Sequence, residues 1–222
     1  MIVTIDGPAG SGKSTTARAV AGRLGFRHLD SGAFYRALTH AALRAGIPDE
    51  RWPALDAAAL DALAVSARPA AEGWCLYAGE DDITAEIRSP EVNARVSLMA
   101  RVPAVRAWLL GRLRAAADHA DLVADGRDMG SVVFPAAELK VFLVAVPRER
   151  ARRRLAEQGR LAPTAAEVEA EVERLLERDR IDSSREVAPL LRPPDAVIID
   201  TTALSFEQQV DEVVALARRR GA

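Results

Sequence analysis

The chain is short of several residue types, and each shortage excludes a class of protein. Its only cysteine is Cys75, so an internal disulfide framework is excluded and a reducing compartment is favoured. It contains no run of about 18 apolar residues, which is the length that a membrane-spanning helix requires. Met1 leads directly into an expected strand, without the basic and apolar regions of a signal peptide. We therefore expect a soluble, cytoplasmic protein, and we expect it to be a monomer.

A large net charge is also lacking. The 222 residues include 30 basic and 32 acidic side chains, so the net charge is −2 and there is no general electrostatic case for binding nucleic acid or a membrane. Asn93 is the only asparagine, so the Asn-Lys-x-Asp motif with which GTPases read guanine is absent. Only Lys13 and Lys140 are lysines, and the other basic residues are arginines. A basic position without a specific need for lysine would therefore be an arginine in this chain.

What the chain does contain is a phosphate-binding loop near its start. Residues 2–6 are an apolar, β-branched run typical of a buried parallel strand, and residues 16–24 have helical periodicity. Between them, residues 7–14 read G-x-x-x-x-G-K-S. Glycines let backbone N–H groups close around phosphate oxygens, and the helix N-terminus adds a partial positive charge. We expect the loop to bind ATP through Gly7, Pro8, Ala9, Gly10, Ser11, Gly12, Lys13, Ser14 and Thr15. Lys13 should reach the β- and γ-phosphates, and Ser14 should bind Mg²⁺ directly.

The order of apolar runs predicts the fold class. Runs at residues 2–6, 26–30, 121–125, 140–146 and 196–200 alternate with helical patterns. This alternation predicts an α/β fold of the P-loop NTPase type, with three layers and a five-stranded parallel sheet carrying helices on both faces. We expect helices over residues 31–43 (capped by Ser31), 52–66, 87–119 (interrupted at Pro103), 164–180 and 205–220 (capped by Ser205). Residues 74–84 read as two short β-like runs around a Gly/Asp turn.

A second informative segment follows the strand at residues 121–125. This strand ends in Asp125, as in a Walker B carboxylate that orients Mg²⁺ through water. Arg127 and Asp128 come next, at the edge of the sheet where α/β proteins bind ligands.

Basic residues then gather between residues 148 and 185. Arg150 and Arg154 lie four apart on an expected helix, and after a phosphate loop this favours a polyphosphate clamp over a solvated basic face or a nucleic-acid patch. Arg178, Asp182 and Arg185 recur at helical spacing, so one face would present two cations around a carboxylate. The histidines His28, His40 and His119 show no partner pattern, and we assign them no role.

A small phosphate-loop protein with an insertion after its second strand and an arginine-rich hairpin before its last strand fits a kinase of small molecules. We interpret residues 1–222 as one P-loop kinase domain. Its core would comprise residues 1–45, 87–147 and 186–222, with an α+β insertion at 46–86 that covers the acceptor. Residues 148–185 would form a lid and the helix after it.

Together these segments resemble the bacterial cytidylate kinase family of nucleoside monophosphate kinases. The resemblance spans nearly the whole chain, and its most specific parts are Asp125-Gly-Arg-Asp128 and Arg178-Asp-Arg-Ile-Asp-Ser-Ser-Arg185. Two departures are a short lid tip around Gly159 and Ile181 in place of a more usual acidic residue. The resemblance implies transfer of the γ-phosphate of ATP to CMP and dCMP in pyrimidine nucleotide metabolism, with Mg²⁺ as cofactor and small nucleotides as partners.

The resemblance also implies a role for each matched residue. The CMP phosphate would be held by Arg36, Arg127 and Arg185, the region near the sugar and phosphate by Ser31, Arg178 and Asp182, and cytosine by Ser97, Arg106 and Asp128. The catalytic set would be Lys13, Arg127, Arg150 and Arg154. Asp128 can accept a hydrogen bond from the cytosine amine while Arg106 donates to the ring acceptors, which predicts cytosine over uracil.

Two other functions stay open on the sequence. One is a related P-loop kinase with another acceptor, such as shikimate, gluconate or a different nucleotide. The other is a nucleotide-dependent RNA-binding or regulatory module that uses the arginines of residues 148–160.

Overall fold

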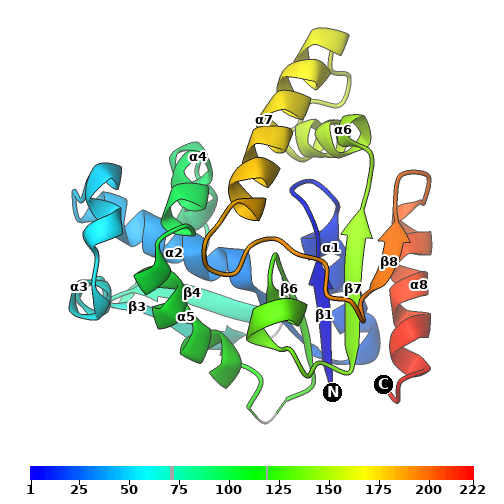
Figure 1. Cartoon of the computed structure of the whole chain (residues 1–222), viewed down its shortest axis with the longest axis horizontal. Helices are drawn as coiled ribbons and strands as arrows, with labels where there is room; N and C mark the ends of the chain where they lie inside the picture. Colours follow the sequence, from blue (N-terminus) through cyan, green and yellow to red (C-terminus); the bar gives the residue numbers. More distant parts are fainter. Residues whose placement is uncertain (71–72, 119) are drawn as a thin grey trace.

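The computed structural model describes residues 1–70, 73–118 and 120–222 (Figure 1). His119 and residues 71–72 of the expected insertion lie outside the described residues. In chain order the elements are β1 (Ile2–Asp6), α1 (Lys13–Leu24), β2 (Arg27–Asp30), α2 (Ser31–Arg44), a 3₁₀ turn (Asp49–Ala54), α3 (Ala57–Ala62), β3 (Val65–Ala70), β4 (Gly73–Ala78), β5 (Asp81–Asp82), a second 3₁₀ turn (Glu86–Arg88), α4 (Pro90–Met99), α5 (Pro103–Ala115), β6 (Leu122–Gly126), a short helical turn (Met129–Val133), β7 (Leu139–Val144), α6 (Pro147–Glu157), α7 (Ala165–Ser183), β8 (Val197–Asp200) and α8 (Phe206–Arg218).

The main sheet has five parallel strands in the order β2-β6-β1-β7-β8, which confirms the expected sheet. Because all five strands run the same way, their carboxyl ends meet at one edge, where α/β proteins bind ligands. The phosphate loop follows the central strand β1 at this edge. In the pairing of β1 with β6, Ile5 lies opposite Asp125, so the expected Walker B carboxylate is placed beside the start of the loop.

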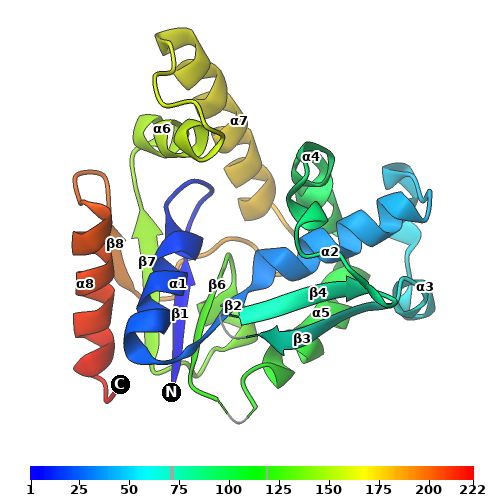
Figure 2. The same cartoon turned by 180° about the vertical axis from the view of Figure 1, so that it is seen from behind.

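Helices cover both faces of the sheet and make the expected three layers (Figures 1 and 2). Side chains along β6 alternate between the two cores. Leu122 and Ala124 join the core formed with α2, α4 and α5, whereas Val123 joins the core formed with α1 and α8. Figure 1 shows α6 and α7 standing above the carboxyl ends of β1 and β7, with the second sheet on the side opposite α8.

The second sheet is antiparallel, in the order β3-β4-β5, and it corrects one expectation. The two β-like runs at residues 74–84 are confirmed as β4 and β5. The helix expected over residues 52–66 is wrong, because α3 ends at Ala62 and β3 begins at Val65. Ala64 has a φ of 51°, which ends the helical path. Pairing of β3 with β4 from Val65 to Ala70 then overrides the alanine-rich local pattern.

The two expected helix caps have different outcomes. Ser205 is confirmed as the N-cap of α8, since its hydroxyl accepts from the Gln208 N–H at 3.2 Å while Gln208 accepts from the Ser205 N–H at 2.9 Å. Ser31 is not a cap. The carboxylate of Asp30 takes that role in α2, accepting from the Ala33 N–H at 3.1 Å, because the Ser31 hydroxyl is buried and donates to the carbonyl oxygen of residue 125 at 2.8 Å.

Replacing Ser205 with alanine is expected to lower the free energy of unfolding by about 1 kcal/mol, since the first turn of α8 loses an acceptor for a backbone N–H. Urea unfolding of the two proteins measures the difference. Ser205→Thr, which keeps a hydroxyl, should retain most of the stability. A threonine variant as unstable as the alanine variant would contradict the capping role.

No helix in the described part of the chain is both long enough and apolar enough to cross a membrane.

Candidate active site

The loop between β1 and α1 has the backbone geometry of a phosphate cradle. Gly10 and Gly12 have φ values of +73° and +86°, in the left-handed region that favours glycine. A Cβ at Gly7 would collide with the Leu143 carbonyl oxygen of the neighbouring strand. At the start of α1, no side chain among the described residues caps the helix. Backbone N–H groups at this terminus are therefore available to an anion.

A cavity of about 400 Å³ opens at the carboxyl edge of the sheet, beside this loop. From the expected site residues it is lined by Ala9, Gly10, Gly12, Lys13, Ser14, Thr15, Ser31, Arg36, Ser97, Arg106, Asp125, Arg127, Asp128, Arg154, Arg178, Asp182 and Arg185. The fold thus brings together residues that lie between Ala9 and Arg185 in the sequence. Four expected residues, Gly7, Pro8, Ser11 and Arg150, are not part of its lining.

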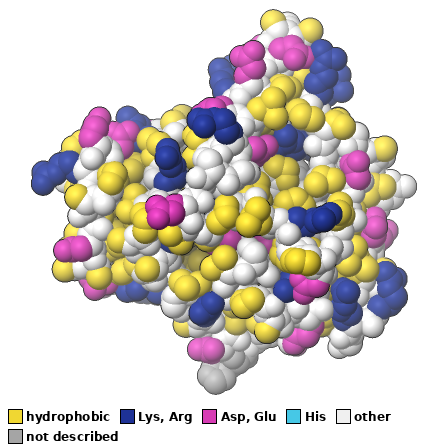
Figure 3. Space-filling model, in the orientation of Figure 1, with side chains coloured by type: hydrophobic (Ala, Val, Ile, Leu, Met, Phe, Trp, Pro, Cys, Tyr) yellow, Lys and Arg dark blue, Asp and Glu magenta, His cyan; other side chains and the backbone are white. Residues whose placement is uncertain are grey.

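The cavity is strongly basic although the chain is not. Its lining includes nine basic and five acidic side chains, an excess of four positive charges, whereas the net charge of the chain is −2. On the outer face shown in Figure 3, basic and acidic side chains are interspersed with apolar ones. The positive charge is therefore concentrated where the phosphate loop is, which is the arrangement that a polyanionic ligand requires.

Within the described residues, several of these cations have only neutral acceptors or none. The Lys13 ammonium donates to the Pro8 carbonyl oxygen at 3.2 Å, and Arg36 Nε donates to the amide oxygen of Asn93 at 3.2 Å. The Nε of Arg178 is buried without a hydrogen-bond partner among the described residues. Buried cations that lack a full set of acceptors are costly, and a bound phosphate would supply the missing acceptors.

The pKa values of these groups reflect the same crowding. Burial, with repulsion from Arg127, lowers the pKa of Lys13 to about 7. Burial, with repulsion from Arg127 and Arg36, lowers the pKa of Arg178 to about 9. Burial also lowers the pKa of Arg36. A polyphosphate between these groups would reverse the effect, because each charge that now destabilises its neighbours would be attracted to the ligand.

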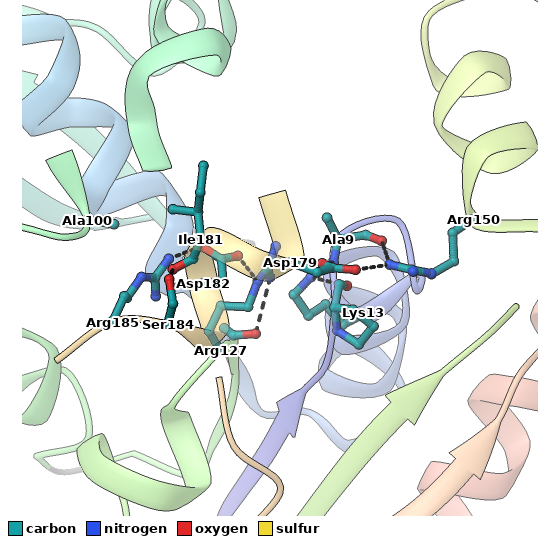
Figure 4. Close-up of polar contacts among 12 residues, drawn as sticks. Ala9, Lys13, Ala100, Arg127, Arg150, Asp179, Ile181, Asp182, Ser184 and Arg185 are labelled. Atoms are coloured by element: carbon teal, nitrogen blue, oxygen red, sulfur yellow. Dashed lines mark hydrogen bonds and ion pairs between the residues drawn. The ribbon is translucent and has the colours of Figure 1, made fainter. Parts of the chain in front are cut away.

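Asp182 binds two arginines of the cavity lining (Figure 4). Its carboxylate accepts from Arg127 Nε at 2.8 Å and from Arg185. Burial raises the pKa of Asp182, but Arg127, Arg185 and Arg178 outweigh this and hold it below its usual value. The expected single helical face is only partly correct, because α7 ends at Ser183, before Arg185. The contact between the arginine and Asp182 nevertheless forms.

A buried ion pair joins Asp128 to Arg106. Arg106 also donates to the Ala100 carbonyl oxygen at 3.1 Å, and its guanidinium lies 5.3 Å from the centre of the Tyr35 ring. The backbone after Asp128 is held by Asp6, whose carboxylate accepts from the N–H groups of residues 129 and 130 at 2.9 and 2.8 Å. Burial raises the pKa of Asp6 to about 7, although those two hydrogen bonds oppose the rise. A donor group and an acceptor group are therefore held together in the cavity lining.

Ser14 and Asp125 also meet in the cavity lining, with the Ser14 hydroxyl donating to the carboxylate. The other oxygen of Asp125 lies 2.7 Å from Nε2 of His28, a residue to which we had assigned no role. A hydroxyl and a carboxylate are oxygen ligands of the kind that Mg²⁺ prefers, so these residues fit the cation. Only the parallel pairing of β2 with β6 brings the histidine here, and no local pattern would have revealed it.

Arg150, four residues before Arg154 on α6, does not line the cavity as Arg154 does. Its guanidinium donates to the Ala9 carbonyl oxygen at 2.9 Å and to Asp179 at 2.5 Å. Sequence reasoning missed Asp179, although it directly follows Arg178 in the quoted motif. It also missed the cavity-lining residues Asp30, Arg18, Tyr35, Arg88, Glu157 and Leu175. Of these, Arg18 carries a usable signal, because it lies four residues after Ser14 on the loop helix.

The comparisons with known proteins agree with this geometry. The family model described as "Cytidylate kinase" matches residues 3–219. A cytidylate kinase from Geobacillus kaustophilus (strain HTA426) is 42% identical over 218 residues, covering 98% of this chain and 96% of that protein. A bifunctional pantoate ligase/cytidylate kinase from Synechococcus sp. (strain WH7803) is 45% identical over 99% of this chain, which spans only 45% of that protein's length. Among solved structures, an uncharacterized protein from Eubacterium ventriosum ATCC 27560 has a TM-score of 0.53 at 10% identity, with 99% of this chain and 98% of that chain covered, which supports the fold alone.

Proposed function

The chain belongs to the cytidylate kinase family, and from this premise we propose that it transfers the γ-phosphate of ATP to CMP and dCMP, giving ADP and CDP or dCDP. The observation that carries the proposal is a single cavity with a phosphate loop on one wall and a group of arginines around Asp182 on the other. Such a cavity can hold two nucleotides with their phosphates facing each other.

The donor end uses the loop. Its backbone N–H groups and Lys13 bind the β- and γ-phosphates of ATP. Arg154, on the lid side of the cavity, contacts the phosphates, and Arg150 contributes its remaining N–H groups, since its Nη1 stays bonded to Ala9 and Asp179. Mg²⁺ would be held directly by Ser14 and through water by Asp125, and it would supply positive charge at the phosphate oxygens.

The acceptor end uses the residues that follow β2, β6 and α7. The phosphate of CMP is bound by Arg36, Arg127 and Arg185, because a planar guanidinium fork matches phosphate oxygens. The remaining acceptor contacts are made by Ser31, Arg178 and Asp182 near the sugar and by Ser97, Arg106 and Asp128 at the base. The insertion at residues 46–86 and the lid at 148–185 close over the two nucleotides.

The chemistry needs little beyond this positioning. An oxygen of the CMP phosphate attacks the γ-phosphorus of ATP. The bond from that phosphorus to the oxygen that bridges the β- and γ-phosphates breaks as ADP leaves. The attacking phosphate is already largely dianionic at neutral pH, so no proton has to be removed. The transferred group is stabilised by Lys13 and the surrounding arginines, and excluding water directs it to CMP instead of to hydrolysis. In the cell we propose a cytoplasmic monomer of pyrimidine nucleotide metabolism, with nucleotides rather than nucleic acid or membrane as its partners.

The test is ADP production with a panel of acceptors: CMP, dCMP, UMP, AMP, shikimate and gluconate. We expect rapid ADP release with CMP and dCMP and little with the others. Faster release with shikimate or gluconate would support the alternative small-molecule kinase. Slow hydrolysis independent of any acceptor, together with salt-sensitive RNA binding, would support the regulatory alternative.

ATP binding is expected to take up about one proton at pH 8 and much less at pH 6. Lys13 has a pKa of about 7 in the free protein, below its ordinary 10.5, so at pH 8 it is mostly neutral. A bound polyphosphate raises that pKa, and the ammonium therefore gains a proton on binding. Isothermal titration calorimetry in two buffers with different ionisation enthalpies measures the uptake. Lys13→Met should abolish it, and an unchanged uptake in that variant would contradict the assignment to Lys13.

A further inference from the structure

The contact between α7 and the phosphate loop points to a role for Asp179, a residue that the proposed function does not use. We propose that Asp179 is a positioning residue that fixes α7 to the loop, and that this contact aligns the donor phosphate with the acceptor phosphate. The inference rests on the proposed function, because it concerns the same transfer between two nucleotides.

The contact is a closed set of three hydrogen bonds (Figure 4). One carboxylate oxygen of Asp179 accepts from the Ala9 N–H at 3.0 Å, and the other accepts from Arg150 Nη1 at 2.5 Å. The same Nη1 donates to the Ala9 carbonyl oxygen at 2.9 Å. One residue of the loop is therefore held through both of its backbone polar groups, by α7 and α6 together.

The surroundings make this contact stiff. The side chains of Arg150 and Asp179 are only 5% and 16% exposed. The backbone of α6 rests directly on the loop, because a Cβ added at Gly10 would lie 2.9 Å from the Arg150 carbonyl oxygen. Charge-assisted hydrogen bonds are about twice as strong as neutral ones and gain further in a partly buried setting. The contact therefore holds the loop against both helices at Ala9 while Asp179 is in place.

The position of Asp179 links the two ends of the cavity. It lies on α7 beside Arg178 and one turn from Asp182, both of which line the acceptor end. Its partner Ala9 lines the donor end. A shift of α7 against the loop would change the distance between the two phosphates, and a misplacement of about 1 Å can cost about a hundredfold in rate. Water then competes better for the γ-phosphate.

The experiment measures ADP and CDP formed in the same reaction, with ATP and CMP, by Asp179→Ala and Asp179→Asn. The ratio of ADP to CDP does not depend on the fraction of folded enzyme, so a loss of stability alone cannot change it. For the unaltered protein we expect a ratio near one. For Asp179→Ala we expect the ratio to rise at least about twofold and kcat to fall at least about tenfold, with smaller changes in KM for both nucleotides. The matched control is Glu177→Gln, on the same helix, where an exposed pair with Arg180 is lost.

Asp179→Asn is the second variant and decides the test if the alanine variant fails to fold. Its amide keeps one oxygen for the Ala9 N–H but loses the charge that holds Arg150, so we expect an intermediate ratio. Ratios equal to that of the unaltered protein in every folded variant at this position would overturn the inference and leave the proposed function intact. If the unaltered protein formed no CDP at all, the proposed function would fail, and this inference with it.

Discussion

Replacing Lys13 with methionine is expected to reduce kcat for CMP phosphorylation at least about a thousandfold, the largest effect of any substitution considered. The Lys13 side chain is buried at the start of α1, and its one hydrogen bond within the described residues is to a backbone carbonyl oxygen at 3.2 Å. The charge is therefore available to the β- and γ-phosphates, and burial strengthens its attraction to them. Methionine preserves the length of the aliphatic chain, so steady-state kinetics report mainly the loss of charge.

The chain offers a close control in its other lysine. Lys140 is as buried as Lys13, at 9% against 8% exposure, but it pairs with Asp195 at 2.8 Å and is not part of the cavity lining. Lys140→Met should lower stability and leave kcat within about twofold of the unaltered value. If Lys13→Met kept a tenth of the activity or more, the donor would have to be bound elsewhere.

Substituting Asp128 is expected to change which base the enzyme accepts. Cytosine carries an amine that donates to the Asp128 carboxylate, whereas uracil presents an oxygen at the same place and leaves a buried acceptor unpaired. An unpaired buried polar group costs about 1–3 kcal/mol, which corresponds to roughly 5- to 150-fold in kcat/KM. Asp128→Ala should therefore reduce the CMP/UMP ratio of kcat/KM at least about tenfold. Asp128→Asn, whose amide can donate to the uracil oxygen, should reduce it further.

The ratio is the decisive readout because either substitution also removes the partner of Arg106 and lowers stability. Both substrates are assayed on the same preparation, so the fraction of folded enzyme cancels. A useful control is Asp61→Asn, since Asp61 is an exposed carboxylate bonded to Trp108 at 2.7 Å, outside the cavity lining. Its ratio should not change. Were Asp128→Ala to keep the original CMP/UMP preference, another group would have to read the base.

Local sequence determined much of the fold and the chemical character of the site. The glycines and lysine of residues 7–14 form a compact motif whose geometry depends on neighbours in the chain, so the loop and its helix follow from the sequence directly. The buried strands, including the one that ends in Asp125, are apolar runs, so their place in a parallel sheet could be predicted from order and alternation alone. It could likewise be predicted that the arginine-rich segments bind an anion.

The tertiary structure decided which polar groups meet. His28 contacts Asp125 across 97 residues, and Asp179 contacts the Ala9 N–H across 170 residues. Hydrophobic periodicity indicates only which residues are neighbours within about two turns of a helix or along one strand. Neither contact could therefore be predicted from the local sequence. The same reason explains the two local errors, since β3 exists through its pairing with β4 and the Ser31 hydroxyl is taken by a carbonyl oxygen of β6. The residue types at the site were thus readable from the sequence, but their partners required the fold, because a hydrogen bond between distant segments depends on where the sheet places them.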